Sequence, residues 1–391
     1  MDSRLALSAL ALGAFMVTNL AGATGPTPAA RPAPDDAVVP IVYMIDLSSG
    51  AELVAREAGR RFVPASITKA MTLYVAFELI RQGTLDPDQS LPIRDDTFRE
   101  WSGKGSTMYI PARTSVRVDD LLMGIANISA NDGAMVLAEG VAGSAQAWTS
   151  LMNAEARKLG MRDSHFATPN GWADEGRTFT TARDLARLAR ALVERHPQLY
   201  ARYIGKPGFT YNGISQFNHD PLSGRVLGAD GIKTGFTGQA GHGFLGSAER
   251  GGRRLVLVVA GAPSQSARNL LARDLVEWGF TATRSRALFP ADTEIGRAQV
   301  QGGDALRVPL VTGPLPVGAT LPPHGAVPVR LTVRYHGPLA APIAAGEQVA
   351  ELEVAAAGMP ASRVPLFAGA SVAPAGPLDR LMNGLAGLLR W

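Results

Sequence analysis

Residues 66–82 form a segment that is apolar around nearly its whole circumference, and this segment constrains the fold most. Its apolar positions are Ile67, Met71, Leu73, Tyr74, Val75, Phe77, Leu79 and Ile80. Pro64 before it and Gly83 after it are typical start and stop signals of a helix. A helix without a polar face is buried, so the rest of the chain must enclose it.

With 391 residues, the chain is long enough for at least two folded units. Periodic patterns predict further helices at 118–125, 145–159, 181–195 and 266–279. Strand patterns occur at 38–47, 52–56, from 231 onward, 243–248 and 254–260. After about residue 284, Pro, Gly and Val dominate, and short alternating runs predict a small all-β domain. We therefore expect an α+β chain.

The N-terminus has the features of a secretory signal. Arg4 precedes an apolar run over 5–20, and Ala21-Gly22-Ala23 then gives a small-x-small cleavage pattern. We expect residues 1–23 to be a signal peptide and 24–37 a Pro/Ala-rich linker. The alternative is an uncleaved anchor helix, although the apolar run is short for a membrane span. Either way, the body of the protein is exported.

The composition argues against several classes of function. The net charge is only +4, and no basic stripe predicts a nucleic-acid partner. The sequence has no cysteine, which excludes disulfides and thiol catalysis. Its six histidines show no metal-ligand spacing, and no glycine-rich phosphate loop is evident. We expect neither a metal nor a cofactor.

Ser66 and Lys69 are the strongest local signal for chemistry. Residues three apart lie on one face of a helix, so the serine hydroxyl and the lysine amine should meet. Serine needs a base, and a lysine can serve only after burial or a second cation lowers its pKa from about 10.4. The chain has five lysines among 38 Lys and Arg residues. Taken alone, the spacing arises by chance about one time in four.

Two further motifs follow along the chain. Ser129-Ala130-Asn131 comes after an apolar stretch, where a hydroxyl and an amide can project together into a cleft, although both are ordinary turn residues. Lys233-Thr234-Gly235 stands at the start of an expected strand. Its cation and hydroxyl can hold a carboxylate, and its glycine lets a substrate backbone approach. The alternative is a solvated edge strand.

In this order, the three motifs resemble those of serine β-lactamases and penicillin-binding proteins. More specifically, the sequence resembles the low-molecular-mass penicillin-binding proteins that are serine-type D-alanyl-D-alanine carboxypeptidases, over about residues 38–391. The segments that carry this likeness are 64–69, 129–132, 168–171, 230–235 and 345–349. The resemblance implies a transpeptidase fold at 38–283, with an antiparallel sheet, helices on both faces and an all-helical lobe. A small all-β domain at 284–373 would follow.

The resemblance also implies roles for single residues. Ser66 would attack the carbonyl of the penultimate D-alanine and Lys69 would take its proton. Ser129 would relay a proton to the leaving nitrogen, and Asn131 would bind the substrate amide. Lys233 would lower neighbouring pKa values.

Further residues would bind the substrate on the other side of the nucleophile. Thr234, with Lys233 and Gly235, would hold the terminal carboxylate, and Arg268 would assist. The backbone N–H groups of Ser66 and Phe236 would form the oxyanion hole. Two residues depart from the family pattern: Ala130 stands where many members have glycine, and Phe236 where several have histidine.

The resemblance implies removal of the terminal D-alanine from a peptidoglycan pentapeptide, with β-lactams as covalent inhibitors. A serine β-lactamase, a D,D-endopeptidase and a catalytically silent cell-wall binding protein remain alternatives. A β-lactamase usually needs a glutamate between the second and third motifs. Glu155, Glu175 and Glu194 lie there, but none stands in a convincing motif.

The C-terminus predicts attachment to a membrane surface. Its apolar stripe consists of Leu378, Leu381, Met382, Leu385, Leu388 and Leu389. The stretch is too short to span a bilayer and suits an amphipathic helix in the interface, at 374–391. A helix docked on the body is the alternative. We expect a periplasmic protein on the outer face of the inner membrane.

Overall fold

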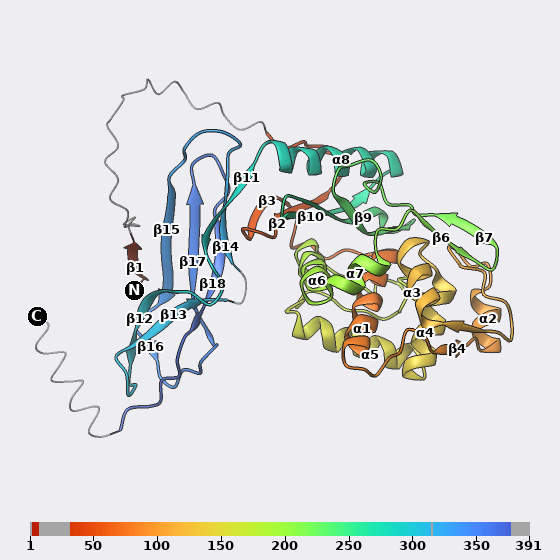
Figure 1. The fold of residues 1–391 in the computed structure, drawn as a ribbon, viewed down its shortest axis with the longest axis horizontal. Helices are drawn as coiled ribbons and strands as arrows, with labels where there is room; N and C mark the ends of the chain where they lie inside the picture. The colour runs from red at the N-terminus through yellow and green to blue at the C-terminus, as the bar shows by residue number, and fades with distance from the viewer. Residues whose placement is uncertain (1, 8–31, 314–315, 377–391) are drawn as a thin grey trace, which may run out of the picture. The chain divides into compact units, whose positions relative to one another are not determined.

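The computed structural model describes residues 2–7, 32–313 and 316–376, which divide into two units (Figure 1). The mixed unit consists of Ala33–Leu47 and Leu53–Phe280. The β unit consists of Met1–Pro32, Ser48–Glu52 and Thr281–Trp391, as far as these are described. All residues of the three motifs belong to the mixed unit.

The mixed unit is built on a five-stranded sheet with the order β3-β2-β10-β9-β8. Its strands are β2 (Ile41–Asp46), β3 (Ala51–Arg56), β8 (Ala229–Thr237), β9 (Gly241–Arg250) and β10 (Arg253–Ala262). β8, β9, β10 and β2 pair antiparallel in that order. Helix α6 (Ala182–Arg195) packs on β10 and β2, and α8 (Gln265–Thr281) covers the other face, where Gly279 approaches Leu255 and Met44 (Figure 1).

Helix α1 (Lys69–Arg81) is the predicted buried helix, and its residues 69–78 are all buried. It is enclosed by α3 (Val118–Asn127), α5 (Ala145–Lys158), α6 and β8. The first turn differs from the prediction, because Ala65–Thr68 form a 3-10 turn rather than α-helix. Ser66 therefore lies in the tighter turn that leads into the helix.

The helical predictions at 118–125, 145–159, 181–195 and 266–279 are confirmed by α3, α5, α6 and α8. The sequence patterns did not predict three helices, α2 (Asp95–Trp101), α4 (Asn131–Ala142) and α7 (Pro197–Tyr203). They also missed the short strand pairs β4 (Ser90–Pro92) with β5 (Ser115–Arg117), and β6 (Gly208–Tyr211) with β7 (Ile214–Phe217).

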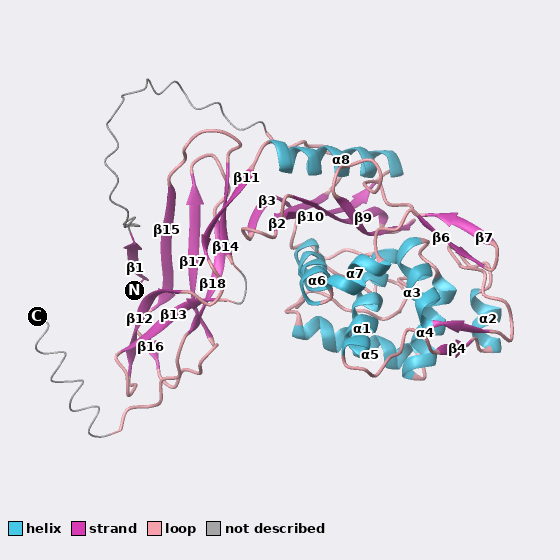
Figure 2. Cartoon of the chain, in the orientation of Figure 1, coloured by secondary structure: helices cyan, strands magenta, loops and turns pink. Residues whose placement is uncertain are grey.

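The β unit has no described helix and is built from strands, as Figure 2 shows. Its sheet has the order β1-β15-β17-β18-β13-β12-β16, and β11 pairs with β14. The bounds are β1 (Asp2–Leu7), β11 (Arg284–Phe289), β12 (Glu294–Gln301), β13 (Arg307–Thr312), β14 (Val317–Leu321), β15 (Val329–His336), β16 (Leu339–Ala340), β17 (Gln348–Ala356) and β18 (Ser362–Ala368). Alternate residues of these strands, such as Val333, Leu352 and Leu366, form a separate core.

The α+β class with a C-terminal all-β domain is therefore confirmed. Most of the predicted signal peptide and linker, and the C-terminal helix from 377 onward, lie outside the described residues. Residues 2–7 are described as strand β1, paired with β15. None of the helices in the described ranges is long and apolar enough to cross a membrane.

Candidate active site

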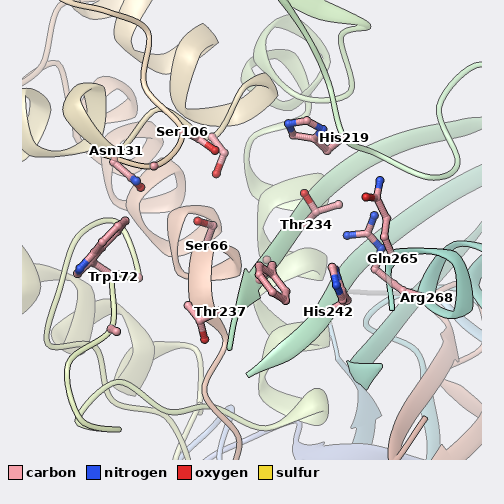
Figure 3. A pocket seen from close by; sticks show the side chains of 16 residues that line it. Ser66, Ser106, Asn131, Trp172, His219, Thr234, Thr237, His242, Gln265 and Arg268 are labelled. Carbon is pink, nitrogen blue, oxygen red and sulfur yellow. The ribbon is translucent and has the colours of Figure 1, made fainter. Parts of the chain in front are cut away.

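A cleft of about 570 Å³ in the mixed unit brings the three motifs together. The predicted site residues that line it are Ser66, Ser129, Asn131, Thr234, Gly235, Phe236 and Arg268. Ser66 lies between Asn131 and Trp172 on one side and Thr234, His242 and Arg268 on the other (Figure 3). The two remaining predicted residues, Lys69 and Lys233, are buried rather than exposed on the wall of the cleft.

The amine of Lys69 has three polar neighbours. Its Nζ lies 2.9 Å from Ser66 Oγ, 2.7 Å from Asn131 Oδ1 and 2.6 Å from the carbonyl oxygen of Asn170. An amide oxygen and a backbone carbonyl can only accept hydrogen bonds. A neutral amine has two N–H groups and one lone pair, so both N–H groups go to these oxygens. The lone pair then faces the Ser66 hydroxyl, as a base for that proton requires.

Burial favours this neutral state of Lys69. The side chain is fully buried, which lowers the pKa of Lys69 well below its usual value, and the charge of Lys233 lowers this pKa further. Asp132 acts in the opposite direction. Burial, with the nearby Arg268 cation, also lowers the pKa of Lys233 to about 7. Both causes expected from the sequence, burial and a second cation, are present.

The second motif spans the junction of α3 and α4. Ser129 adopts a left-handed backbone conformation, with φ of 64°, which is uncommon for a residue with a side chain. Ser129 lines the cleft, and its Oγ has no hydrogen-bond partner among the described residues. Asn131 begins α4, and Asp132 accepts from the backbone N–H of Met108 at 3.0 Å and of Ile110 at 3.2 Å. These bonds hold the neighbouring loop against the motif.

Gly235 packs so closely against the turn that carries Ser66 that the fold itself leaves no room for a side chain at this position. A Cβ atom at this position would lie 2.5 Å from the carbonyl oxygen of Pro64 and 3.1 Å from the backbone nitrogen of Ile67. Strand β8 can therefore pass the turn that carries Ser66 only with glycine here. The motif predicts that this glycine lets a substrate backbone approach, and in the structure the nearest neighbour of the position is the carbonyl oxygen of Pro64.

The far end of the cleft combines an aromatic surface with a cation. Phe236 is 57% exposed and stacks on His242, with ring centroids 4.2 Å apart. Arg268 reaches the cleft from α8 although it is only 3% exposed, and its guanidinium donates to Asn269 Oδ1 at 2.7 Å. Burial lowers the pKa of Arg268 to about 10, so it is still a cation at neutral pH.

Several residues of the site were not predicted as such, and three of them are Asn170, Trp172 and His219. Asn170 lies in the segment 168–171, whose likeness to the family gave no role; its backbone carbonyl binds Lys69. Trp172 and His219 line the cleft from loops and belong to no motif. Burial, together with the Lys233 and Arg268 cations, lowers the pKa of His219. A single tryptophan or histidine in a loop carries no signal in a sequence.

No carboxylate is among the described residues that line the cleft. Glu155 pairs with Lys158 at 2.6 Å and Glu194 lies 3.9 Å from Arg190. Glu175 is exposed and also lies outside the cleft lining. In the part of the chain that the structure describes, no group of three or more His, Cys, Asp or Glu side chains could hold a metal ion.

Comparisons with known proteins identify the family. The D-alanyl-D-alanine carboxypeptidase family matches residues 30–264, and the C-terminal domain of penicillin-binding protein 5 matches residues 284–374. D-alanyl-D-alanine carboxypeptidase DacD of Salmonella typhimurium is 32% identical over 87% of this chain and 88% of its own. DacA of Escherichia coli is 34% identical over 68% of this chain and 67% of its own.

Solved structures have the same architecture. Penicillin-binding protein 5 from Haemophilus influenzae superposes with a TM-score of 0.72 at 29% identity, over 87% of this chain and 99% of that one. Penicillin-binding protein 6B from Escherichia coli gives a TM-score of 0.63 at 28% identity, over 85% of this chain and 96% of that one. The chain therefore belongs to the D-alanyl-D-alanine carboxypeptidase family, the serine-type hydrolases among the penicillin-binding proteins.

Proposed function

We propose that this carboxypeptidase removes the terminal D-alanine from peptidoglycan stem peptides through an acyl-enzyme on Ser66. The observation that carries the proposal is the contact set of Lys69. Its two acceptor-only neighbours, Asn131 Oδ1 and the Asn170 carbonyl, leave the lone pair of the neutral amine to Ser66 Oγ. A serine with a buried, neutral base at hydrogen-bond distance is an activated nucleophile.

In the first half of the reaction, Ser66 Oγ bonds to the carbonyl carbon of the penultimate D-alanine while its proton passes to Lys69. The backbone N–H groups of Ser66 and Phe236 donate to the oxyanion. The C–N bond then breaks, and a proton reaches the leaving nitrogen through Ser129, whose hydroxyl is free of other partners among the described residues. D-alanine leaves, and the acyl group remains on Ser66.

In the second half, water attacks the ester carbonyl and gives a proton to Lys69. The ester C–O bond then breaks, the proton passes from Lys69 to Ser66 Oγ, and the shortened peptide leaves. Substrate binding would use both ends of the cleft. Thr234 and Arg268 line a hydroxyl-bearing and cationic end suited to the terminal carboxylate, and the buried Lys233 lies next to Thr234 in the chain. Asn131 Nδ2 has a second N–H group, which can donate a hydrogen bond to the substrate amide on the acyl side of the scissile bond.

β-Lactams would enter the same cleft as covalent inhibitors. Penicillin-binding protein D2 from Listeria monocytogenes, solved in an ampicillin-bound form, superposes with a TM-score of 0.56 at 29% identity, over 62% of this chain and 98% of that one. The absence of a carboxylate among the described residues of the cleft supports slow hydrolysis of the adduct. It favours a carboxypeptidase over a β-lactamase.

Labelled penicillin tests the proposal directly. We expect the purified protein to gain the mass of one penicillin, located by peptide mapping on the segment that carries Ser66. We also expect it to release D-alanine from a pentapeptide that ends in D-Ala-D-Ala. Rapid penicillin turnover without an adduct would favour a β-lactamase, and no reaction with either compound would favour the silent binding protein. Preferential cleavage of cross-linked dimers would favour an endopeptidase.

We also propose that the mature protein is periplasmic and is held on the inner membrane by its C-terminal segment. A chain that ends at Ala375 should lose the apolar stripe and remain in the soluble fraction, whereas the full chain sediments with membranes. Full-length protein with Leu381→Asp and Leu385→Asp should behave like the truncated chain, because charges on the stripe oppose insertion. Unchanged membrane association of both variants would show that this segment is not the anchor.

A further inference from the structure

The carboxamide of Asn131 has one orientation that suits both of its neighbours. Its Nδ2 donates to the carbonyl oxygen of Lys104 at 3.0 Å, and its Oδ1 accepts from Lys69 Nζ at 2.7 Å. The reversed amide would set oxygen against oxygen at Lys104 and nitrogen against nitrogen at Lys69. The backbone carbonyl of Lys104 therefore decides which end of Asn131 faces the base.

Two indole rings hold the side chain of Lys104. Its ammonium lies 4.5 Å from the ring centroid of Trp101 and 5.2 Å from that of Trp172, within the range of cation–π attraction. The two indoles meet edge to face, with centroids 5.6 Å apart. Trp101 is 5% exposed, whereas Trp172 is 38% exposed and lines the cleft (Figure 3). We call these three residues the indole–lysine cluster.

Trp172 also touches the backbone next to Lys104. A Cβ atom on Gly105 would lie 2.9 Å from Trp172 Cζ3 and 2.9 Å from Asn131 Nδ2, so only glycine allows this packing. On its other side, the backbone N–H of Trp172 donates to Asn170 Oδ1 at 3.0 Å. The carbonyl of the same Asn170 is the third neighbour of Lys69. The contacts thus close a ring around the base.

We propose that Trp172, acting with Lys104, is a positioning residue for proton transfer, because it fixes the amide of Asn131 and so keeps the lone pair of Lys69 on Ser66. This inference rests on the proposed function, since it takes Ser66 as the acylated residue. The aromatic ring is the part that matters. Phenylalanine at 172 preserves a face for the Lys104 ammonium, whereas leucine does not.

The test measures the second-order rate constant of Ser66 acylation by penicillin against pH. Trp172→Leu should slow acylation about tenfold, which corresponds to about 1.4 kcal/mol in the activation free energy. It should also move the acid limb of the profile to higher pH, because water that reaches Lys69 weakens the burial that lowers its pKa. Lys233 and Asp132, the charged groups that act on Lys69, are unchanged in this variant.

Three further variants and one control sharpen the test. Trp172→Phe should recover most of the rate, and Lys104→Met should slow acylation in the same way as Trp172→Leu. The double variant Trp172→Leu/Lys104→Met should be no slower than the slower single variant, because both changes remove one shared contact. Phe217→Leu, at an 85% exposed aromatic residue outside the cleft lining, is the matched control and should react like the wild type.

Two outcomes would overturn the inference. Trp172→Leu could raise only KM for a pentapeptide and leave the acylation rate and the acid limb unchanged. Trp172 would then contact the substrate without positioning the base. If Trp172→Leu and Lys104→Met slow acylation independently, the cluster does not act as a unit. Failure of the wild type itself to acquire penicillin on Ser66 would instead refute the proposed function. Thermal melting of each variant separates these effects from loss of folding.

Discussion

The Ser66→Ala variant should form no adduct with penicillin and should release D-alanine from a pentapeptide at least about 10⁴-fold more slowly than the wild type. The hydroxyl is the atom that becomes acylated, and no other residue in the cleft can replace it while Lys69 points at this position. The remaining donors of the oxyanion hole can supply only a small residual rate. Mass spectrometry of the adduct and a D-alanine assay are the measurements.

The variant should fold normally, since alanine removes only one partly exposed oxygen from the 3-10 turn. Ser150→Ala, at an exposed serine whose Oγ donates to the carbonyl of Gln146 at 3.0 Å, is the matched control and should retain full activity. Lasting acylation of Ser66→Ala would place the nucleophile elsewhere. Ser129, the hydroxyl proposed as the proton relay, would then become the candidate.

The pairing of Ser66 with Lys69 could be predicted from the sequence because it is local. Residues three apart meet in a 3-10 turn as they do in an α-helix, so the difference in the first turn left the contact intact. The remaining neighbours of Lys69 could not be predicted from spacing. The carbonyl of Asn170 is a backbone group, which every residue has, and its position depends on how a loop 101 residues away packs.

Helix α4 shows why local patterns missed an element that carries a motif. It contains Gly133 and Gly140, and glycine inside a helix normally counts against one by about 1 kcal/mol. Here packing overrides that preference, because a Cβ on Gly133 would lie 3.1 Å from Met108 Sδ and one on Gly140 would lie 2.9 Å from Leu91 Cδ1. Tertiary contacts, not propensity, decide the identity of these residues.

The order of the motifs was informative where each motif alone was not. Ser129 and Asn131 are ordinary turn residues, and Lys233 could have been a solvated lysine on an edge strand. In the structure, β8 is an edge strand. Its Lys233 is nevertheless only 4% exposed, and the next residues, Thr234 and Gly235, line the cleft. The resemblance to a family predicted that the three segments form one site. In the structure, the sheet and helices of the mixed unit place residues of all three segments around one cleft.

The Lys69→Met variant should acylate about 10²–10⁴-fold more slowly than the wild type, the usual contribution of a positioned base. Methionine fills a similar volume in this fully buried position, so the loss reflects the missing amine rather than a cavity. Lys158→Met, at an exposed lysine paired with Glu155, is the matched control and should react normally. Thermal melting checks that the unpaired oxygens of Asn131 and Asn170 do not unfold the variant.

The pH profile separates a base from a merely structural lysine. In the wild type, the neutral amine of Lys69 is the reactive form, so acylation should fall as the pH drops through its lowered pKa and the amine takes up a proton. Lys69→Met should lose this acid limb. Any remaining pH dependence near neutrality should come from other groups at the cleft, such as Lys233, whose pKa is lowered to about 7, and His219. If the acid limb persists unchanged in Lys69→Met, another group accepts the proton and the role proposed for Lys69 is wrong.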